Sequence, residues 1–140
     1  MSQTHNIKNL WGDLPLEKTI RTPYIILKEQ ASILTEATNG LLIGSVIKEN
    51  WNSDAGSSAS LLKVTVPSMD NYSVSIVRIE YLITIYPSRI CNLVKNSTSK
   101  EVYTEEDLTD QLGEILSSGE VRKIVSSFLS DIRAENSVNI

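Results

Sequence analysis

The sequence predicts an α+β fold, with an N-terminal helix, an antiparallel β-meander of three to five strands, and two C-terminal helices packed on one face of the sheet. The order of the patterns favours this class, because helical apolar spacing occurs at both ends and alternating spacing lies between them. The length agrees, because 140 residues fit a single domain, 1–140, with one hydrophobic core. Within it we expect an irregular arm at 1–21 and a frayed tail at 135–140.

The first helix is expected to begin after Thr22 and to end near Thr38. Thr22 suits the N-cap because its hydroxyl can accept a hydrogen bond from a free backbone N–H, and the proline that follows has no N–H to leave unpaired. Asn39 and Gly40 tolerate the left-handed conformation in which helices commonly end. The expected core residues of this helix are Ile26, Leu27, Ala31, Ile33, Leu34 and Ala37.

A hairpin is expected next, with strands at 41–48 and 61–66, where apolar residues recur with strand spacing. The connecting run 49–60 contains NWNSDAGSSAS. Its Ser, Asn, Asp and Gly residues favour a flexible loop.

A long β-tract is expected at 72–85, after a turn at 67–71. Since the usual strand has about 5–6 residues, this tract should bulge or divide near Tyr81-Leu82. Two further short β-segments are expected at 90–94 and 101–103, with a polar loop at 96–100 between them.

Two helices are expected in the C-terminal third. Thr104 and Asp107 fit a capping box, in which the threonine caps the helix and the acid reaches back to a backbone N–H. On one straight helix the apolar stripes before and after Ser117 to Gly119 would point about 150° apart, so both could not face the same sheet. That run therefore predicts a sharp corner, with Ser118 as the second N-cap.

The residue inventory excludes most catalytic and metal-binding classes. One His and one Cys are too few for structural zinc, a disulfide scaffold or a His-dependent triad. No glycine-rich nucleotide motif and no G-x-S-x-G occurs. We therefore assign no catalytic, cofactor-binding or metal-ligating residue, expect no cofactor, and expect the chain not to be an enzyme. Cys91 is expected to be a small buried side chain, with Arg89 near enough in sequence to lower its pKa.

Charge and hydropathy patterning limit the partners and the location. Lys and Arg number 13 and Asp and Glu number 17, which gives a net charge of -4 and disfavours binding to nucleic acid or to an anionic membrane. The chain shows no secretory leader and no run of about 18 apolar residues, so a cytoplasmic location is expected.

Four residues are candidates for contact with a partner or ligand: Trp51, Arg78, Glu80 and Arg89. Trp51 opens the Ser-rich loop, where it either lies against the sheet edge or anchors a partner. Arg78 and Glu80 alternate along the polar side of the long β-tract, which favours an ion-pair ladder or a solvated surface over a ligand-contacting pair. An unidentified protein partner is expected, and a homodimer through a sheet edge or the C-terminal helices is the expected form of self-association.

The run from Thr22 to Gly44, which contains TPYIILKEQA and TNGLLIG, resembles an uncharacterised group of small bacterial proteins. The resemblance continues through Ile85-Tyr86-Pro87 to the amphipathic C-terminal helices, and it implies no activity and no site residue. In architecture and acidity the chain is also similar to type III secretion chaperones, which are small acidic α+β dimers that bind extended effector segments.

Two functions remain open after these exclusions. The first is a non-enzymatic cytoplasmic protein-interaction module of accessory, chaperone-like or immunity type. The alternative is a small-molecule-binding protein or an enzyme that uses carboxylates and arginines, with Arg78, Glu80 and Arg89 as its candidate residues.

Overall fold

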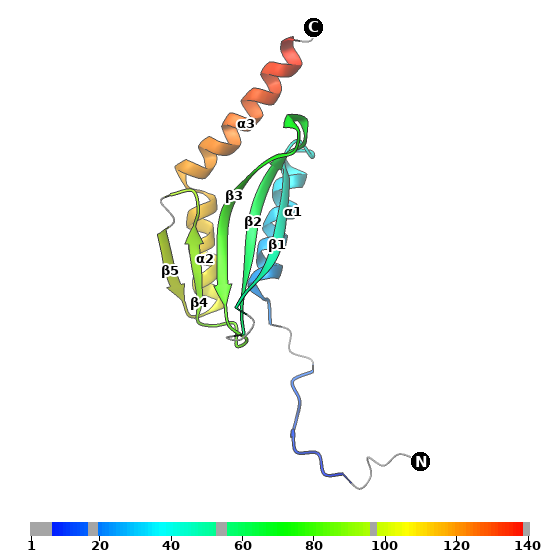
Figure 1. Cartoon of the computed structure of the whole chain (residues 1–140), viewed down its shortest axis with the longest axis vertical. Coiled ribbons are helices and arrows are strands. Elements are labelled where there is room, and N and C mark those ends of the chain that lie inside the picture. Colours follow the sequence, from blue (N-terminus) through cyan, green and yellow to red (C-terminus); the bar gives the residue numbers. More distant parts are fainter. Residues whose placement is uncertain (1–6, 17–19, 53–55, 96–97, 139–140) are drawn as a thin grey trace, which may run out of the picture.

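A computed structural model describes residues 7–16, 20–52, 56–95 and 98–138, without the side chains of 50–52 and 137–138. Over these residues five strands form one antiparallel sheet in the order β1-β2-β3-β4-β5, and the three α-helices lie on one face of it (Figure 1). The strands are β1 (Ile43–Asn52), β2 (Ser57–Val66), β3 (Tyr72–Tyr81), β4 (Ser88–Asn92) and β5 (Thr98–Val102). The helices are α1 (Pro23–Ala37), α2 (Glu105–Leu116) and α3 (Gly119–Val138). The predicted α+β class is confirmed.

The ends of α1 agree with the sequence. The backbone N–H of Ile25 donates to the hydroxyl of Thr22 over 3.3 Å, as an N-cap requires. At the other end Asn39 and Gly40 adopt φ values of 53° and 80°, both in the left-handed region. Local side-chain chemistry therefore sets both boundaries.

The backbone of α1 lies directly against β1 because residue 44 is glycine. A Cβ at this position would lie 2.5 Å from the carbonyl oxygen of Ala31 and 2.7 Å from its Cα. Thr35 joins the two elements, since its hydroxyl donates to the carbonyl of Ala31 over 3.1 Å and accepts from the N–H of Gly44 over 2.9 Å. This flank of α1 is therefore closed by backbone contact and hydrogen bonds.

The first hairpin has longer strands than the sequence predicts, and the predicted loop is wrong for 49–52 and 57–60, while residues 53–55 lie outside the described part. β1 continues to Asn52 and β2 begins at Ser57. β2 extends further than predicted because it is an interior strand, which pairs with β1 on one side and β3 on the other. Ala59 and Ser60 are buried there, and this tertiary setting outweighs the weak strand preference of Ser and Ala.

β3 ends at Tyr81, where the sequence places a break, but the predicted β-structure of 82–85 is wrong, because these residues form a turn in which the N–H of Ile85 donates to the carbonyl of Leu82. A bulge also occurs, but it lies earlier, because Leu62 pairs with Val77 while Lys63 pairs with Ser75. The residue between them, Ile76, is buried, so the bulge adds an apolar side chain to the core. The predicted polar loop at 96–100 is wrong for Thr98 to Lys100, which belong to β5, and residues 96–97 lie outside the described part.

The break between the C-terminal helices is confirmed. Thr104 accepts from the N–H of Asp107 over 3.0 Å, although the Asp107 carboxylate accepts from Tyr103, not from Thr104 as in a capping box. Ser118 accepts from the N–H of Val121 over 3.4 Å at the start of α3. From there α3 changes direction and runs past the end of the sheet (Figure 1). It remains helical as far as Val138, beyond the predicted start of fraying at 135.

The hydrophobic core lies between the sheet and the helices. Its fully buried side chains come from α1, β2, β3, β4, β5, α2 and the segment before β1, and the largest are Ile26, Leu27, Leu42, Ile76, Ile79, Ile90 and Leu108. The contribution of α3 is thinner, because Val121 and Ile132 are buried whereas the apolar residues between them are only partly buried. The covered face is therefore sealed near α1 and more open near the C-terminal helices.

Candidate protein-interaction site

The face of the sheet without helices, here the open face, holds three of the four residues selected from the sequence. The register places Glu49, Ala59, Glu80, Arg89 and Glu101 in one row across the five strands. Arg78 lies in the adjacent row, between Leu61 and Cys91. The strands that form this face are turned toward the viewer in Figure 1. The sheet therefore brings Arg78, Glu80 and Arg89 together.

These charges form a surface ladder. Nε of Arg78 lies 3.6 Å from Oε1 of Glu49, so the pair spans β2 diagonally. Glu80 and Arg89 are direct cross-strand partners, an arrangement in which opposite charges stabilise a sheet modestly. The hollows described below are lined by other residues. The geometry therefore supports the ion-pair ladder over a ligand pair enclosed in a pocket.

The remaining reactive group of the open face is Cys91, which is partly exposed. Burial raises the pKa of its thiol and Glu80 raises it further, while Arg78 and Arg89 lower it by less. Arg89 does lower the pKa of this thiol, as expected, but desolvation outweighs the nearby positive charges and the net shift is upward. At neutral pH the thiol is protonated and is a poor nucleophile.

Trp51 lies within β1 and not in a loop. Its side chain lies outside the described part of the chain, so both alternatives for it, contact with the sheet edge and anchoring of a partner, stay predictions. His5 also lies outside the described part.

A groove separates α1 from the C-terminal helices and consists of two adjoining hollows. The first, of about 390 Å³, lies between α1 and α2 and includes Ile26, Leu112 and Arg122 in its lining. The second, of about 240 Å³, has β2 and β3 as its floor. Gln30 and Leu116 line both hollows, so the two adjoin.

The second hollow of the groove is almost wholly apolar. Among the described residues that line it Gln30 alone is polar, and the others are Ala31, Ile33, Leu34, Ala37, Leu62, Val64, Ile76, Leu116, Val121 and Val125. Ile33 lies at its edge with 56% of its surface exposed. A concave apolar surface of this kind suits an apolar side chain from outside the fold.

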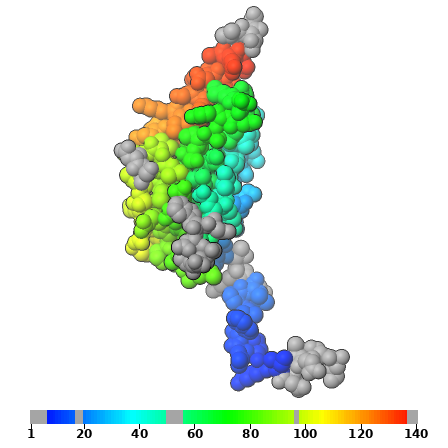
Figure 2. All heavy atoms as spheres, in the orientation of Figure 1, coloured from blue at the N-terminus to red at the C-terminus, as the bar shows by residue number. Residues whose placement is uncertain are grey.

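The N-terminal arm, residues 7–16, leaves large apolar side chains in water. Leu10, Trp11 and Leu16 are exposed over 84%, 80% and 85% of their surfaces, and Ile7 and Leu14 are also exposed. Figures 1 and 2 show this segment standing clear of the helices and strands. The predicted irregular arm agrees with these residues, which form neither helix nor strand.

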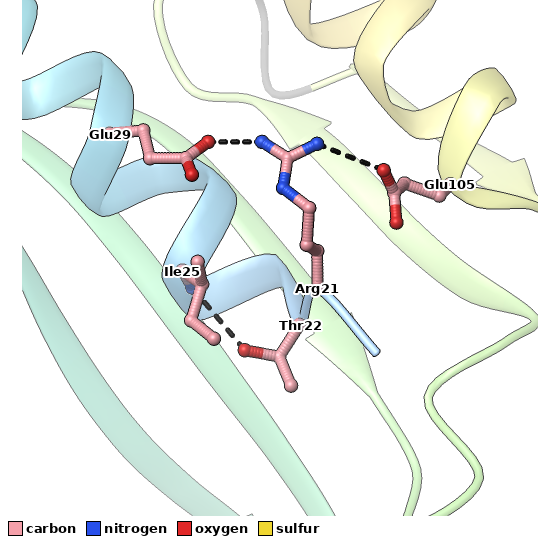
Figure 3. Close-up of polar contacts among 5 residues, drawn as sticks. All are labelled: Arg21, Thr22, Ile25, Glu29 and Glu105. Carbon is pink, nitrogen blue, oxygen red and sulfur yellow. Dashed lines mark hydrogen bonds and ion pairs between the residues drawn. The ribbon is translucent and has the colours of Figure 1, made fainter. Parts of the chain in front are cut away.

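Arg21 fixes the point where the chain enters α1. Its guanidinium lies between α1 and α2 and donates to Glu29 on one helix and, over 2.9 Å, to Glu105 at the start of the other (Figure 3). These carboxylates, Glu29 first, raise the pKa of Arg21 above its ordinary value. Because Arg21 also lines the first hollow, this bridge spans one end of the groove.

The groove and the Arg21 bridge are the features that sequence reasoning misses. Arg21 and Glu105 are 84 residues apart, and no local pattern links them. The groove depends on the distance between α1 and α2, which the amphipathic patterns of the two helices do not predict. One signal was available in the arm, where Leu10, Trp11 and Leu14 have no paired apolar element in the predicted fold.

Comparison with known proteins gives no relative, because no family model, no curated protein and no solved structure matches this chain. Within the described ranges, none of the helices has the length and apolar character needed to cross a membrane. Within the same ranges no three His, Cys, Asp or Glu residues gather where they would hold a metal ion.

Proposed function

We propose that the chain is a non-enzymatic protein-interaction module, of accessory, chaperone-like or immunity type, that engages its partner through the N-terminal arm. The observation that carries this proposal is the exposure of Leu10, Trp11, Leu14 and Leu16 on a segment that stands clear of the fold. Apolar surface of this size costs free energy in water and marks a site of association.

The magnitudes favour a multi-residue contact. Burying the exposed part of Trp11 contributes roughly 3–5 kcal/mol of transfer free energy, at about 25 cal/mol per Å². Association itself costs an estimated 4–15 kcal/mol, and ordering the arm adds to this cost. Trp11 alone is therefore too little for a stable complex, and the neighbouring leucines are needed with it.

The enzymatic alternative has weaker support. General acid–base catalysis requires carboxylates held within reach of a bound substrate and shielded from water. Glu80 and Arg89 instead lie side by side on the open face, and Arg78 is engaged across β2 with Glu49. The high pKa of Cys91 also argues against covalent catalysis by the thiol.

We further propose a cytoplasmic location. The support is that the chain has a single cysteine, Cys91, so it carries no internal disulfide that would require an oxidising compartment. Fractionation of the native host into cytosolic and other fractions tests this, and recovery of the chain outside the cytosol would contradict it.

The functional proposal is tested by comparing three forms of the tagged full-length chain expressed at native abundance. These are the wild type, Trp11→Ser/Leu14→Ser, and Lys8→Ser as the matched control in a polar position of the same arm. We expect the wild type and the control to cross-link specifically to a partner. Either another protein or a second copy of the chain would support the proposal. The double variant should lose that cross-link. Retention of the partner by the double variant, or no specific partner with the wild type, would contradict the proposal.

A further inference from the structure

The arm and the groove are complementary in shape and polarity. The groove offers a concave apolar surface whose second hollow has Gln30 as the one polar residue among its described lining residues. The arm offers Leu10, Trp11 and Leu14, which are apolar, closely spaced and exposed. Each surface supplies what the other lacks, and within one chain the described arm lies away from the groove (Figure 1).

The charges are complementary as well. Arg122 lines the first hollow, where its Nε donates to the carbonyl of Ser117 over 3.1 Å. The ion pairs among the described residues involve neither Arg122 nor Asp13 of the arm. Asp13 lies between Trp11 and Leu14 in sequence. A pair between Asp13 and Arg122 would bring Trp11 and Leu14, which flank Asp13 closely in the sequence, to the first hollow.

The bridge at Arg21 disfavours occupancy of the groove by the arm of the same chain. The arm joins the body at Arg21, whose side chain spans the adjoining end of the groove between Glu29 and Glu105 (Figure 3). To enter its own groove the arm would have to reverse direction and pass over this bridge. An arm from a second molecule can approach from the open side of the groove without disturbing it.

From these observations we infer that the partner of the arm is a second copy of this chain, and that two copies exchange arms, each arm lying in the α1/α2/α3 groove of the other. This inference rests on the proposed function, because it names the partner of the same arm. Reciprocal exchange closes into a two-fold dimer and leaves no arm unpaired. Each Trp side chain removes on the order of 150–250 Å² from water. With the leucines and both groove walls, two arms reach the roughly 1,200–2,000 Å² of a stable interface.

The test uses the purified full-length chain and measures its molar mass by light scattering over a wide concentration range. The arm variant is Trp11→Ser/Leu14→Ser. The groove variant is Ile33→Asp, which alters an exposed residue and so leaves the core intact. The matched control is Ile25→Asp, the same substitution at an exposed position of α1 outside the groove. We expect the wild type and Ile25→Asp to be dimers, and the arm and groove variants to dimerise more weakly by about 30-fold or more.

Mixing the two defective variants adds a complementation test. A heterodimer of the arm variant and the groove variant retains one intact arm and one intact groove, so we expect the mixture to regain dimer that neither variant forms alone. Trp11 emission, followed in a Trp51→Phe background, should shift to shorter wavelength in the dimer and not in the Ile33→Asp variant.

Three results would overturn the inference. A dimer unaffected by the arm variant would place the interface elsewhere, such as a sheet edge or α3. A monomer with blue-shifted Trp11 emission would show that the arm occupies its own groove. A monomer with water-exposed Trp11 would show that the arm does not occupy the groove. In that case arm-dependent cross-linking to a different protein would still support the proposed function. Failure of the dimer inference can therefore be distinguished from failure of the proposed function.

Discussion

The two flanks of α1 meet their neighbours in different ways. Toward β1 the helix backbone touches Gly44, where a Cβ would lie 2.5 Å from the carbonyl oxygen of Ala31. On the other flank, Gly113 of α2 faces open space, with no atom within 4 Å of an added Cβ. Gly113 lines the first hollow of the groove. The same helix is thus sealed on one side and separated from its neighbour on the other, which indicates that the groove is a local feature and not general looseness of packing.

The largest expected effect on the free energy of unfolding comes from adding a methyl group between α1 and β1. Gly44→Ala forces a methyl group into the backbone of α1, and the helix must move because the contacting atoms cannot rotate away. We expect a loss of about 3 kcal/mol in the free energy of unfolding, at the upper end for overpacking. Urea unfolding followed by circular dichroism measures it. An unchanged midpoint would show that α1 and β1 are not in backbone contact.

Thr35→Val tests the hydrogen bonds of the same flank at almost constant volume. The substitution removes the acceptor of the Gly44 N–H and the donor to Ala31. We expect a loss of about 1–2 kcal/mol, because a partly buried N–H loses its partner. Thr109→Val is the matched control, since that hydroxyl makes an exposed bond to Glu106 within α2. Equal losses in the two variants would show that Thr35 has no special role in holding α1 to β1.

Gly113→Ala is the counterpart of Gly44→Ala on the groove side. It replaces a helix-interior glycine where space is available, so in the Trp11→Ser/Leu14→Ser background, which leaves the groove without an arm, we expect stabilisation by roughly 0.5–1 kcal/mol. The opposite signs of the two Gly→Ala substitutions express the difference between the flanks. A destabilising Gly113→Ala, measured in the same urea experiment, would mean that α1 and α2 are packed closely in solution.

The smallest effect on the fold is expected at the groove edge. Ile33→Ala removes an exposed apolar group, so the unfolding free energy of the monomer, measured in the Trp11→Ser/Leu14→Ser background, should change by less than about 0.5 kcal/mol. In the wild-type background the same substitution should weaken dimerisation. A large loss of monomer stability would show that Ile33 belongs to the core of a single chain.

The fold was predictable wherever local chemistry sets a boundary. Thr22 caps α1, Asn39 and Gly40 end it, and Ser118 starts α3, and each acts through its own backbone conformation or a hydrogen bond to a near neighbour. The predictions were wrong where a neighbouring strand decides. Residues 49–60 and 98–100 look like loops by composition, but pairing with adjacent strands makes most of them β-structure.

The candidate site was less predictable for the same reason. Arg78 and Glu80 were recognised as one polar surface because strand alternation is local, whereas the pairing of Arg89 with Glu80 is set by the sheet. The groove instead arises from the spacing of α1 and α2, and the Arg21 bridge joins residues 84 positions apart. Both depend on tertiary packing, which the periodicity of a single element does not reveal, and the one available signal was the unpaired apolar residues of the arm.

The central claim is that an arm of one molecule lies in the groove of another, and a cysteine cross-link between two differently labelled chains tests it most directly. In a Cys91→Ser background, one chain carries Leu14→Cys and the other carries Gln30→Cys, a residue that lines both hollows. A disulfide requires Cα atoms within roughly 7 Å, so it reports close approach. We predict that mild oxidation joins the two chains far faster than it joins Leu14→Cys to a chain carrying Lys63→Cys, which lies on the open face. Equal rates for the two pairs would contradict the exchange of arms.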